Sequence, residues 1–443
     1  MNGLKTMTMG CKAAWWIFIC AGAAAAASAG GGARTLDMTA VKPEALGFSS
    51  ERLERLHALI QGEIDDQRLA GAITILARHG RVVDYRTYGM QDVARGAPMT
   101  KDVIFRDYSM TKPVTGVAMM ILFEKGKWLP ADPLSKYIPE FAGLKVFAGV
   151  NGDGKANLVE PEHAPTVREL MTHTAGFSYG SGHSAVDAMY QEQKPMQSRD
   201  LGEMVKKLAA IPLNYQPGKG WTYSVSMDVE GYLVEKLSGQ SLGEFMWRRI
   251  FEPLGMKDAG FYVPREKRAR FATNYRDTEG RLVPVSAEGK PPEDYAAAPT
   301  MPSGGGGLVS TAEDYYRFAQ MLANGGELDG KRILAPSTVR LMASNHLPGP
   351  LLTGEFGIGQ HVMRPGFGYG FNCAVVFDPA AAALPDGKDT FFWDGAAGTW
   401  FWVDPANDIV FIGMIQRMGG NDNHSLEYRS HSTVYQALAD PSR

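Results

Sequence analysis

The segment 105–112, F-R-D-Y-S-M-T-K, and the apolar run that follows it to Phe123 constrain the fold of this chain more than any other stretch. Proline is tolerated in the first turn of a helix, where its missing N–H would be unpaired, so Pro113 predicts a helix that begins near Ser109. The residues beyond Pro113 are apolar almost all round, which is typical of a helix buried in a large protein. Ser109 and Lys112 are three residues apart and are therefore expected to lie one turn apart on one face.

This pair indicates an activated nucleophile. A lysine amine would be held against a serine hydroxyl, and the helix N-terminus supplies free backbone N–H groups and the positive end of the helix dipole. The alternative is a solvated helix face, because S-x-x-K is a weak pattern that also occurs by chance. Solvation is the poorer explanation, since Lys112 begins an otherwise apolar helix.

Residues 1–29 have the order of a secretory signal peptide. Lys5 and Lys12 give a basic start, Ala13–Ala27 is apolar and small, and Ala27-Ser28-Ala29 is an A-x-A cleavage site. A membrane anchor is the alternative, but the apolar core is shorter than the ~20 residues that a span needs. We therefore expect a periplasmic or secreted protein with no stable membrane insertion after cleavage.

The composition is that of an ordinary globular protein. The chain has 443 residues, of which 44% are apolar and 21% charged, and its net charge of −3 favours neither a nucleic-acid partner nor an anionic membrane. Two of its three cysteines, Cys11 and Cys20, lie in the signal segment. Cys373 would be left alone, so no intramolecular disulfide is expected and stability must come from a large core.

The order of predicted elements is strands, helices, then strands. The simplest packing joins the N-terminal hairpin and the C-terminal strands in one antiparallel sheet flanked by helices, an α/β (α+β) fold with the mainly helical middle as an inserted lobe. We expect the sheet part at about 45–105 with 305–435, and the lobe at about 106–304. The predicted strands are 70–78, 82–88, 374–377, 391–393, 399–403 and 409–415. One helix is predicted to begin at 49–50, and further helices are predicted over 109–123, 166–174, 199–211, 227–238, 311–322 and 432–439. Gly304–Gly307 is predicted to be a flexible loop.

Two further segments carry polar or small residues suited to catalysis. Tyr223 follows a Q-P-G turn, and a tyrosine in such a loop can move a proton if nearby cations lower its pKa. By itself it is more often a surface or packing residue. The segment 391–402 indicates two strands joined by a small-residue turn, in which Gly395 and Ala396 let a ligand approach the backbone. An N–H near Ala396 could then form half of an oxyanion hole, although a tight aromatic hairpin is the plainer interpretation.

Together and in this order, these segments resemble the serine β-lactamase and penicillin-binding-protein superfamily, and within it class C β-lactamases and family VIII carboxylesterases. The resemblance covers about residues 45–435 and implies a single β-lactamase/transpeptidase-like hydrolase domain over 30–443. The matching motifs are S-M-T-K at Ser109–Lys112, Y-S-V at Tyr223–Val225, W-D-G at Trp393–Gly395, H-T-A-G at His173–Gly176 and the glycine-rich segment Gly305–Asp314.

The resemblance also implies roles. Ser109 would attack a carbonyl carbon and form an acyl-enzyme, and Lys112 would lower the pKa of its neighbours. Tyr223 would relay the proton to the leaving group and later activate water, while the N–H groups of Ser109 and Ala396 hold the oxyanion. The sequence leaves open whether Lys112 or Tyr223 is the base, because coupled groups titrate as a pair. No cofactor is implied.

Two departures from the lactamase pattern favour small neutral esters over anionic lactams and peptides. Val225 stands where lactamases carry an asparagine that binds the substrate amide, and Trp393 stands where they carry a lysine that draws in the carboxylate. The resemblance therefore implies that Val225, Trp393 and Gly395, together with Ala396, contact the substrate. The alternatives are a β-lactamase or D,D-peptidase/D-aminopeptidase, an acyltransferase, and a penicillin-binding sensor that acylates once without turnover. Acyl size and oligomeric state remain open.

A second serine matches a different motif. Gly176–Gly180 reads G-x-S-x-G, the nucleophile elbow of α/β-hydrolases, with Ser178 at its centre. That elbow needs a strand before the serine and a helix after it, whereas a short helix is predicted before Ser178. The nine histidines show no metal-ligand spacing, so no metal site is predicted.

Overall fold

The computed structural model describes residues 1, 35–152, 154–285, 295–352, 362–419 and 422–442, so the predicted signal segment lies almost entirely outside the described residues. The described fold from Thr35 onward is one compact unit. Within the described part of the chain, none of the helices combines the length and the apolar character needed to cross a bilayer.

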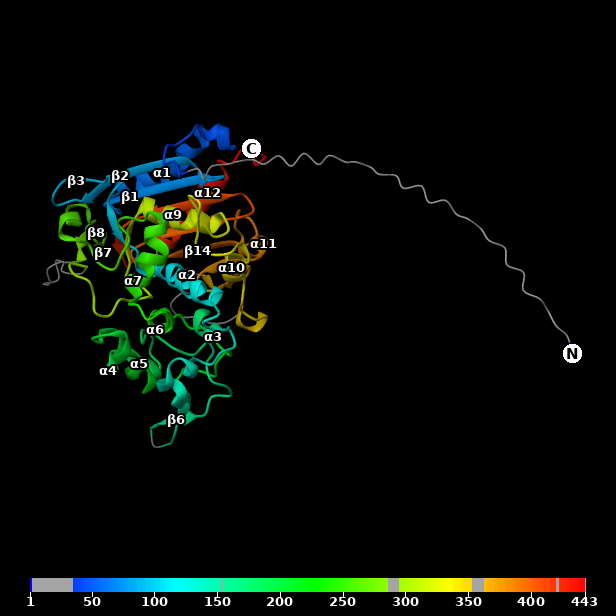
Figure 1. The fold of residues 1–443 in the computed structure, drawn as a ribbon. Coiled ribbons are helices and arrows are strands. Elements are labelled where there is room, and N and C mark those ends of the chain that lie inside the picture. The colour runs from blue at the N-terminus through cyan, green and yellow to red at the C-terminus, as the bar shows by residue number, and fades with distance from the viewer. Residues whose placement is uncertain (2–34, 153, 286–294, 353–361, 420–421, 443) are drawn as a thin grey trace. The chain divides into compact units, whose positions relative to one another are not determined.

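An eight-stranded antiparallel sheet forms the centre of the fold (Figure 1) and takes strands from both ends of the chain, as predicted. The N-terminal strand β1 pairs with the C-terminal strand β16, with Ile75 opposite Ile412. Every residue of β1 and of β16 is buried, because helices cover both faces of the sheet. In order across the sheet the strands are β12 (Phe367–Tyr369), β13 (Ala374–Val376), β14 (Thr390–Asp394), β15 (Trp400–Asp404), β16 (Ile409–Met414), β1 (Gly71–Arg78), β2 (Arg81–Asp92) and β3 (Ala97–Pro98).

The predicted N-terminal hairpin is present with a two-residue turn. Arg78 pairs with Arg81, and His79 and Gly80 between them both have positive φ, at 51° and 68°. Two consecutive left-handed residues make a turn whose twist matches that of the flanking strands.

Smaller ladders complete the β-structure. The parallel pair β17–β7 joins the end of the chain to the middle, and β4–β9 joins the residues before Ser109 to those after the glycine segment. These strands are β4 (Ile104–Arg106), β9 (Val309–Thr311), β5 (Val146–Val150), β6 (Ala156–Val159), β7 (Tyr275–Thr278), β8 (Arg281–Pro284), β17 (Arg417–Met418), β10 (Glu327–Leu328) and β11 (Lys331–Arg332).

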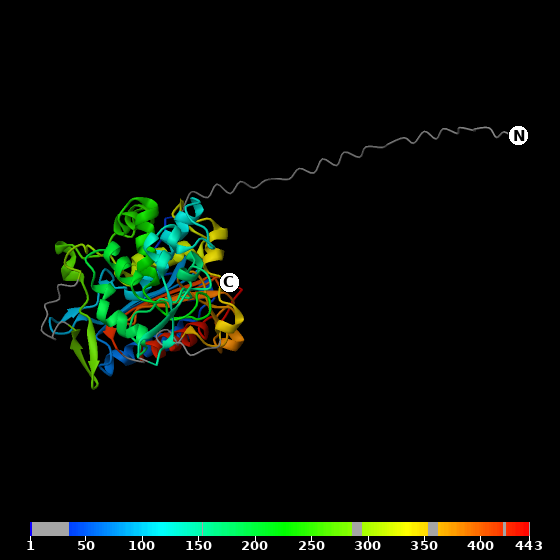
Figure 2. The same cartoon turned by 90° about the horizontal axis from the view of Figure 1, so that it is seen from below.

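Helices lie on both faces of the sheet. The helix α9 packs on β15, β16 and β1, whereas α1 and α12 pack together at the other face, and the helices of the middle of the chain gather around α2 and α6 (Figures 1 and 2). The α-helices are α1 (Ser50–Asp65), α2 (Thr111–Glu124), α3 (Val167–Met171), α4 (Ala185–Gln193), α5 (Leu201–Ala209), α6 (Ser226–Ser238), α7 (Leu242–Met246), α8 (Glu252–Leu254), α9 (Ala312–Ala323), α10 (Pro336–Met342), α11 (Pro379–Ala382) and α12 (Asp422–Tyr435).

Short helical turns connect these elements. They are the 3₁₀ turns η1 (Pro43–Leu46), η2 (Tyr108–Met110), η3 (Leu134–Lys136), η4 (Pro139–Gly143), η5 (Pro195–Gln197), η7 (Arg265–Arg270) and η9 (Gly349–Leu352), and the π-helical turn η6 (Trp247–Phe251).

Two predictions about these elements are wrong. The last helix runs over Asp422–Tyr435 rather than 432–439, because its early residues are mostly polar and gave little apolar pattern. The Gly304–Gly307 segment is closely packed rather than a loose loop. A Cβ on Gly304 would lie 2.3 Å from the Met227 carbonyl oxygen, so this glycine permits close backbone approach.

Two glycine-to-alanine substitutions should change stability in opposite directions. A Cβ on Gly413 in β16 would lie 2.3 Å from the Trp400 indole, so we expect G413A to destabilise the fold by about 1–3 kcal/mol through overpacking. Gly62 in α1 has no atom within 4 Å of a built Cβ, so G62A should stabilise by about 0.5–1 kcal/mol through helix propensity. Urea unfolding measures both, and equal effects of the two would contradict the packing described for β16.

Candidate active site

Ser109 lies in the 3₁₀ turn η2, directly before α2, close to the position that Pro113 predicted. The preceding residue, Tyr108, has a φ of +45°, a left-handed conformation that is uncommon outside glycine. Its hydroxyl accepts a hydrogen bond from the Asn274 Nδ2, at 2.9 Å. Backbone strain of this kind persists where the surroundings hold it, and it is concentrated at functional sites.

Hydrogen bonds fix the backbone just before Ser109. The Asp107 N–H donates to the Leu308 carbonyl at 3.0 Å, and the Asp107 carbonyl accepts from the Thr399 hydroxyl at 3.1 Å. Gly395 is also close: a Cβ there would lie 2.4 Å from the Asp107 carbonyl oxygen. The Ser109 turn therefore touches both the glycine segment before β9 and the turn after β14.

Lys112 is the buried cation of the site, with 1% of its surface exposed. Its Nζ lies 3.0 Å from the Ser109 Oγ and donates to the Gly305 carbonyl at 2.6 Å. Burial lowers the pKa of Lys112 to about 7, although the negative charges of Asp228, Asp394 and Glu230 oppose that fall. A substantial fraction of this amine is consequently neutral at neutral pH and can accept a proton.

Tyr223 meets the same amine from the segment before α6. The Lys112 Nζ lies 4.4 Å from the centre of the Tyr223 ring. Burial raises the pKa of Tyr223 well above its ordinary value, and the polar groups of Ser109 and Trp393 only partly offset the rise. The expectation that cations lower this pKa is therefore wrong, and Tyr223 stays protonated as a donor.

Two buried acids lie behind Lys112 on α6. Asp228 Oδ1 accepts from the Ser303 hydroxyl at 2.5 Å and from the Gly305 N–H at 3.1 Å. Glu230 Oε2 accepts from the Asn372 amide at 2.7 Å. Burial raises the pKa of Asp228, and it raises that of Glu230 to about 8.

The turn after β14 brings Ala396 to the surface beside the Ser109 turn. Ala396 is exposed whereas Gly395 is buried, and the turn is closed by the Gly395 N–H, which donates to the Thr399 carbonyl at 2.7 Å. β14 also contacts η2. This placement brings the predicted oxyanion residue next to the nucleophile segment.

Val225 and Trp393 lie deeper than expected. Val225 has 0% of its surface exposed and Trp393 has 1%, so neither contacts a substrate in this conformation. Trp393 packs on Tyr223, with ring centres 5.6 Å apart. The expectation that these two side chains contact the substrate is therefore corrected. Trp400 and Trp402 on the neighbouring strand lie with their rings against Phe411 at the other face of the sheet.

An ion-pair cluster adjoins the Ala396 turn. Within the described residues Asp394, His424 and Glu427 place potential ligand atoms within 4.8 Å of one another, with the His424 Nδ1 at 3.0 Å from the Asp394 Oδ2. Burial disfavours the charged imidazole, but hydrogen bonds to the two carboxylates outweigh burial and raise the pKa of His424 to about 10. A cation already occupies this cluster in the form of the imidazolium.

Ser178 has a structural environment. The short helix α3 precedes it in place of the strand that a nucleophile elbow requires. Its hydroxyl donates to the Asp187 Oδ1 at 2.6 Å and accepts from the Gly180 N–H at 2.9 Å. No lysine or histidine side chain is among these partners.

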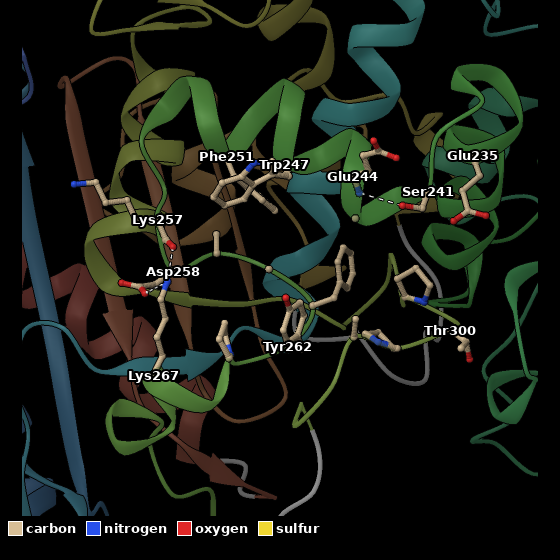
Figure 3. A pocket seen from close by; sticks show the side chains of 18 residues that line it. Glu235, Ser241, Glu244, Trp247, Phe251, Lys257, Asp258, Tyr262, Lys267 and Thr300 are labelled. Carbon is tan, nitrogen blue, oxygen red and sulfur yellow. Dashed lines mark hydrogen bonds and ion pairs between the residues drawn. The ribbon is translucent and has the colours of Figure 1, made fainter.

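A cavity of about 530 Å³ lies apart from these groups (Figure 3). Aromatic side chains, including Trp247, Phe251 and Tyr262, line it, and its described lining residues include none of Ser109, Lys112 and Tyr223. The cavity is therefore separate from the site around the buried lysine.

The structure brings together Ser109 and Lys112, Tyr223, and the Ala396 turn from three segments of the chain. Sequence reasoning missed Asp228 and Glu230, although a D-V-E triplet in the first turns of the helix after Tyr223 was a usable signal. It also missed the Gly305 carbonyl as a lysine partner. Every residue has a backbone carbonyl, so the sequence cannot show which one binds a lysine.

Comparison with known proteins assigns the chain to a family. The Beta-lactamase family matches residues 56–434, so the chain belongs to that family and is a serine hydrolase. The chain is 35% identical to protein Rv1367c of Mycobacterium tuberculosis, over 82% of this chain and 90% of that protein. It is 33% identical to esterase EstB of Burkholderia gladioli, over 84% and 92%. The solved structure of EstCE1, a hydrolase with promiscuous acyltransferase activity, superposes with a TM-score of 0.74 at 28% identity, over 87% of this chain and 99% of that one.

Covalent labelling distinguishes the two serines. Treatment with a fluorophosphonate should place the adduct on the Ser109 peptide, because only Ser109 lies beside a buried amine. S109A should abolish the adduct and lower kcat by at least about 10³-fold, as loss of a covalent nucleophile does. The matched variant S178A should keep the adduct and most of the activity, provided that its thermal melting shows a folded protein. Labelling of Ser178 in the wild type would contradict this assignment.

Proposed function

We propose that this chain is a carboxylesterase that cleaves small neutral esters through an acyl-enzyme on Ser109. The observation that carries the proposal is the buried Lys112 amine at 3.0 Å from the Ser109 hydroxyl, which can be neutral at physiological pH. The similarity to esterase EstB supports the substrate class, and the similarity to the hydrolase EstCE1 supports the reaction type.

Acylation follows from the positions of the protein groups. Neutral Lys112 takes the proton of the Ser109 hydroxyl as the oxygen attacks the ester carbonyl carbon, and the N–H groups of Ser109 and Ala396 stabilise the oxyanion. The ester C–O bond then breaks, and the departing alkoxide takes the proton of the Tyr223 hydroxyl. Lys112 returns its proton to Tyr223, which restores both groups.

Deacylation reverses the same steps with water in place of the alcohol. Neutral Lys112 takes the Tyr223 hydroxyl proton while the Tyr223 oxygen takes a proton from water, and the water oxygen attacks the acyl carbon. The bond between the acyl carbon and the Ser109 oxygen then breaks, and the Ser109 oxygen takes the proton back from the Lys112 ammonium group, which leaves Lys112 neutral. An alcohol in place of water would give acyl transfer, and EstCE1, described as having promiscuous acyltransferase activity, lends weight to that second reaction.

The W-D-G motif at Trp393–Gly395 favours neutral substrates. Position 393 offers a buried indole, where the lactamase pattern places a lysine that meets the substrate carboxylate. Loss of one charged hydrogen bond costs about 1.5–3 kcal/mol. At about 1.4 kcal/mol per tenfold change, this lowers kcat/KM for an anionic lactam by roughly 10- to 100-fold relative to a neutral ester.

A substrate comparison tests the proposed class. We expect kcat/KM for p-nitrophenyl butyrate to exceed that for nitrocefin by at least about 10-fold on the same preparation, with S109A as the blank for both. Equal or better turnover of nitrocefin would replace the esterase proposal by the lactamase alternative. A single burst of product without turnover would mark a sensor instead.

We further propose that the protein is exported and loses residues 1–29. The basic, apolar and A-x-A order of that segment supports this proposal. N-terminal sequencing of the mature protein would decide it, because Gly30 should be the first residue.

A further inference from the structure

The Lys112 amine is held by a backbone carbonyl that is itself held by a buried acid. Lys112 donates to the Gly305 carbonyl at 2.6 Å, and the N–H of the same Gly305 donates to the Asp228 Oδ1 at 3.1 Å. Asp228 has 0% of its surface exposed, and its Oδ1 also accepts from the Ser303 hydroxyl. This chain of contacts connects α6, the glycine segment and α2 at one point.

The glycine segment has no room to adjust at this point. A Cβ on Gly305 would lie 2.6 Å from the Asp228 Oδ2 and 2.7 Å from the Tyr179 hydroxyl. The Asp228 Oδ2 is buried, and within the described residues no hydrogen-bond donor reaches it. A carboxylate placed this way retains one oxygen without a hydrogen bond, and the nearby ammonium form of Lys112 is the group that would compensate its charge.

We propose that Asp228 is a positioning residue for Lys112, which orients the Gly305 carbonyl toward the amine and keeps a negative charge facing it. This inference rests on the proposed roles of Ser109 and Lys112 in acyl transfer. Asp228 does not touch the substrate. It acts by setting where the Lys112 nitrogen lies and how readily that nitrogen gives up its proton.

Other charged and titratable groups around Lys112 also influence its pKa. Glu230 faces it from α6, Asp394 faces it from β14, and His173, Tyr179 and Tyr223 lie around it from the segments after α3 and before α6. Burial and the Lys112 charge lower the pKa of His173 well below its ordinary value, so its ring stays neutral. Among the carboxylates, Asp228 opposes the fall in the pKa of Lys112 most strongly.

The sign of the expected effect follows from this charge. D228N keeps an oxygen that accepts from Ser303 and Gly305 but removes the negative charge. The ammonium form of Lys112 then loses stabilisation, its pKa falls, and the neutral base is available at lower pH. The acid limb of the kcat/KM profile should move to lower pH by about one unit.

Two further variants distinguish the effect of the Asp228 charge from a purely structural role of Asp228. E230Q replaces the other buried acid of the same helix and leaves the Asp228–Gly305 contact in place. Because burial raises the pKa of Glu230 to about 8, this acid is mostly protonated at neutral pH, and E230Q should shift the acid limb less than D228N. S303A removes a hydrogen bond that stabilises the Asp228 anion. S303A should therefore shift the acid limb of the kcat/KM profile in the same direction as D228N, by a smaller amount. It provides a second measurement of the Asp228 effect if D228N does not fold.

The experiment measures kcat/KM for p-nitrophenyl butyrate from pH 5 to 9 for the wild type, D228N, E230Q and S303A. Fluorophosphonate labelling counts active sites, and thermal melting confirms folding. We expect the downward shift to be largest in D228N. An unmoved limb in folded D228N and S303A would show that Asp228 only supports the fold, whereas a wild type that is neither labelled nor active would refute the proposed function instead.

Discussion

Burial of a lysine amine is the interaction on which the rest of this site depends. An exposed lysine is almost fully protonated at neutral pH and cannot take a proton from serine. Helix α2 is buried over most of its length, so it carries Lys112 into an interior where the charged form is poorly solvated. The hydrogen bond to the Gly305 carbonyl holds the amine in place, and the protonated Tyr223 that lies beside it is the acid in the proposed mechanism.

The fold can place that amine because its sheet joins the two ends of the chain. Pairing of β1 with β16 brings the C-terminal strands, and with them the Ala396 turn, to the N-terminal hairpin. Pairing of β4 with β9 places the glycine segment beside the Ser109 turn. Glycines 304, 305 and 395 permit the backbone to approach other atoms at distances that a side chain would prevent. The site is thus assembled from segments that are far apart in sequence, and backbone contacts hold it.

Local patterns predicted the local features well. The Ser109–Lys112 pairing follows from the periodicity of one helix, and the hairpin and most helices follow from apolar patterns and caps, such as Ser49 before α1. The burial of individual side chains and the contacts between segments far apart in sequence could not be predicted in this way. Val225 and Trp393 read as substrate-facing positions but are buried, because exposure depends on what packs over a strand or a helix end. The α12 helix was mostly missed because a polar sequence can be helical when tertiary contacts support it. The catalytic assignments themselves remain predictions.

Direct titration of Lys112 tests the central claim that its amine is neutral near physiological pH. In protein labelled with ¹³C at lysine Cε, the Lys112 resonance can be assigned by its loss in K112R and followed by NMR from pH 5 to 11. The account predicts a midpoint near 7, because burial outweighs the acids of α6 and β14. A midpoint near 10.5, with the exposed lysines, would contradict it, because Lys112 would then be an ammonium ion that cannot serve as the base for Ser109.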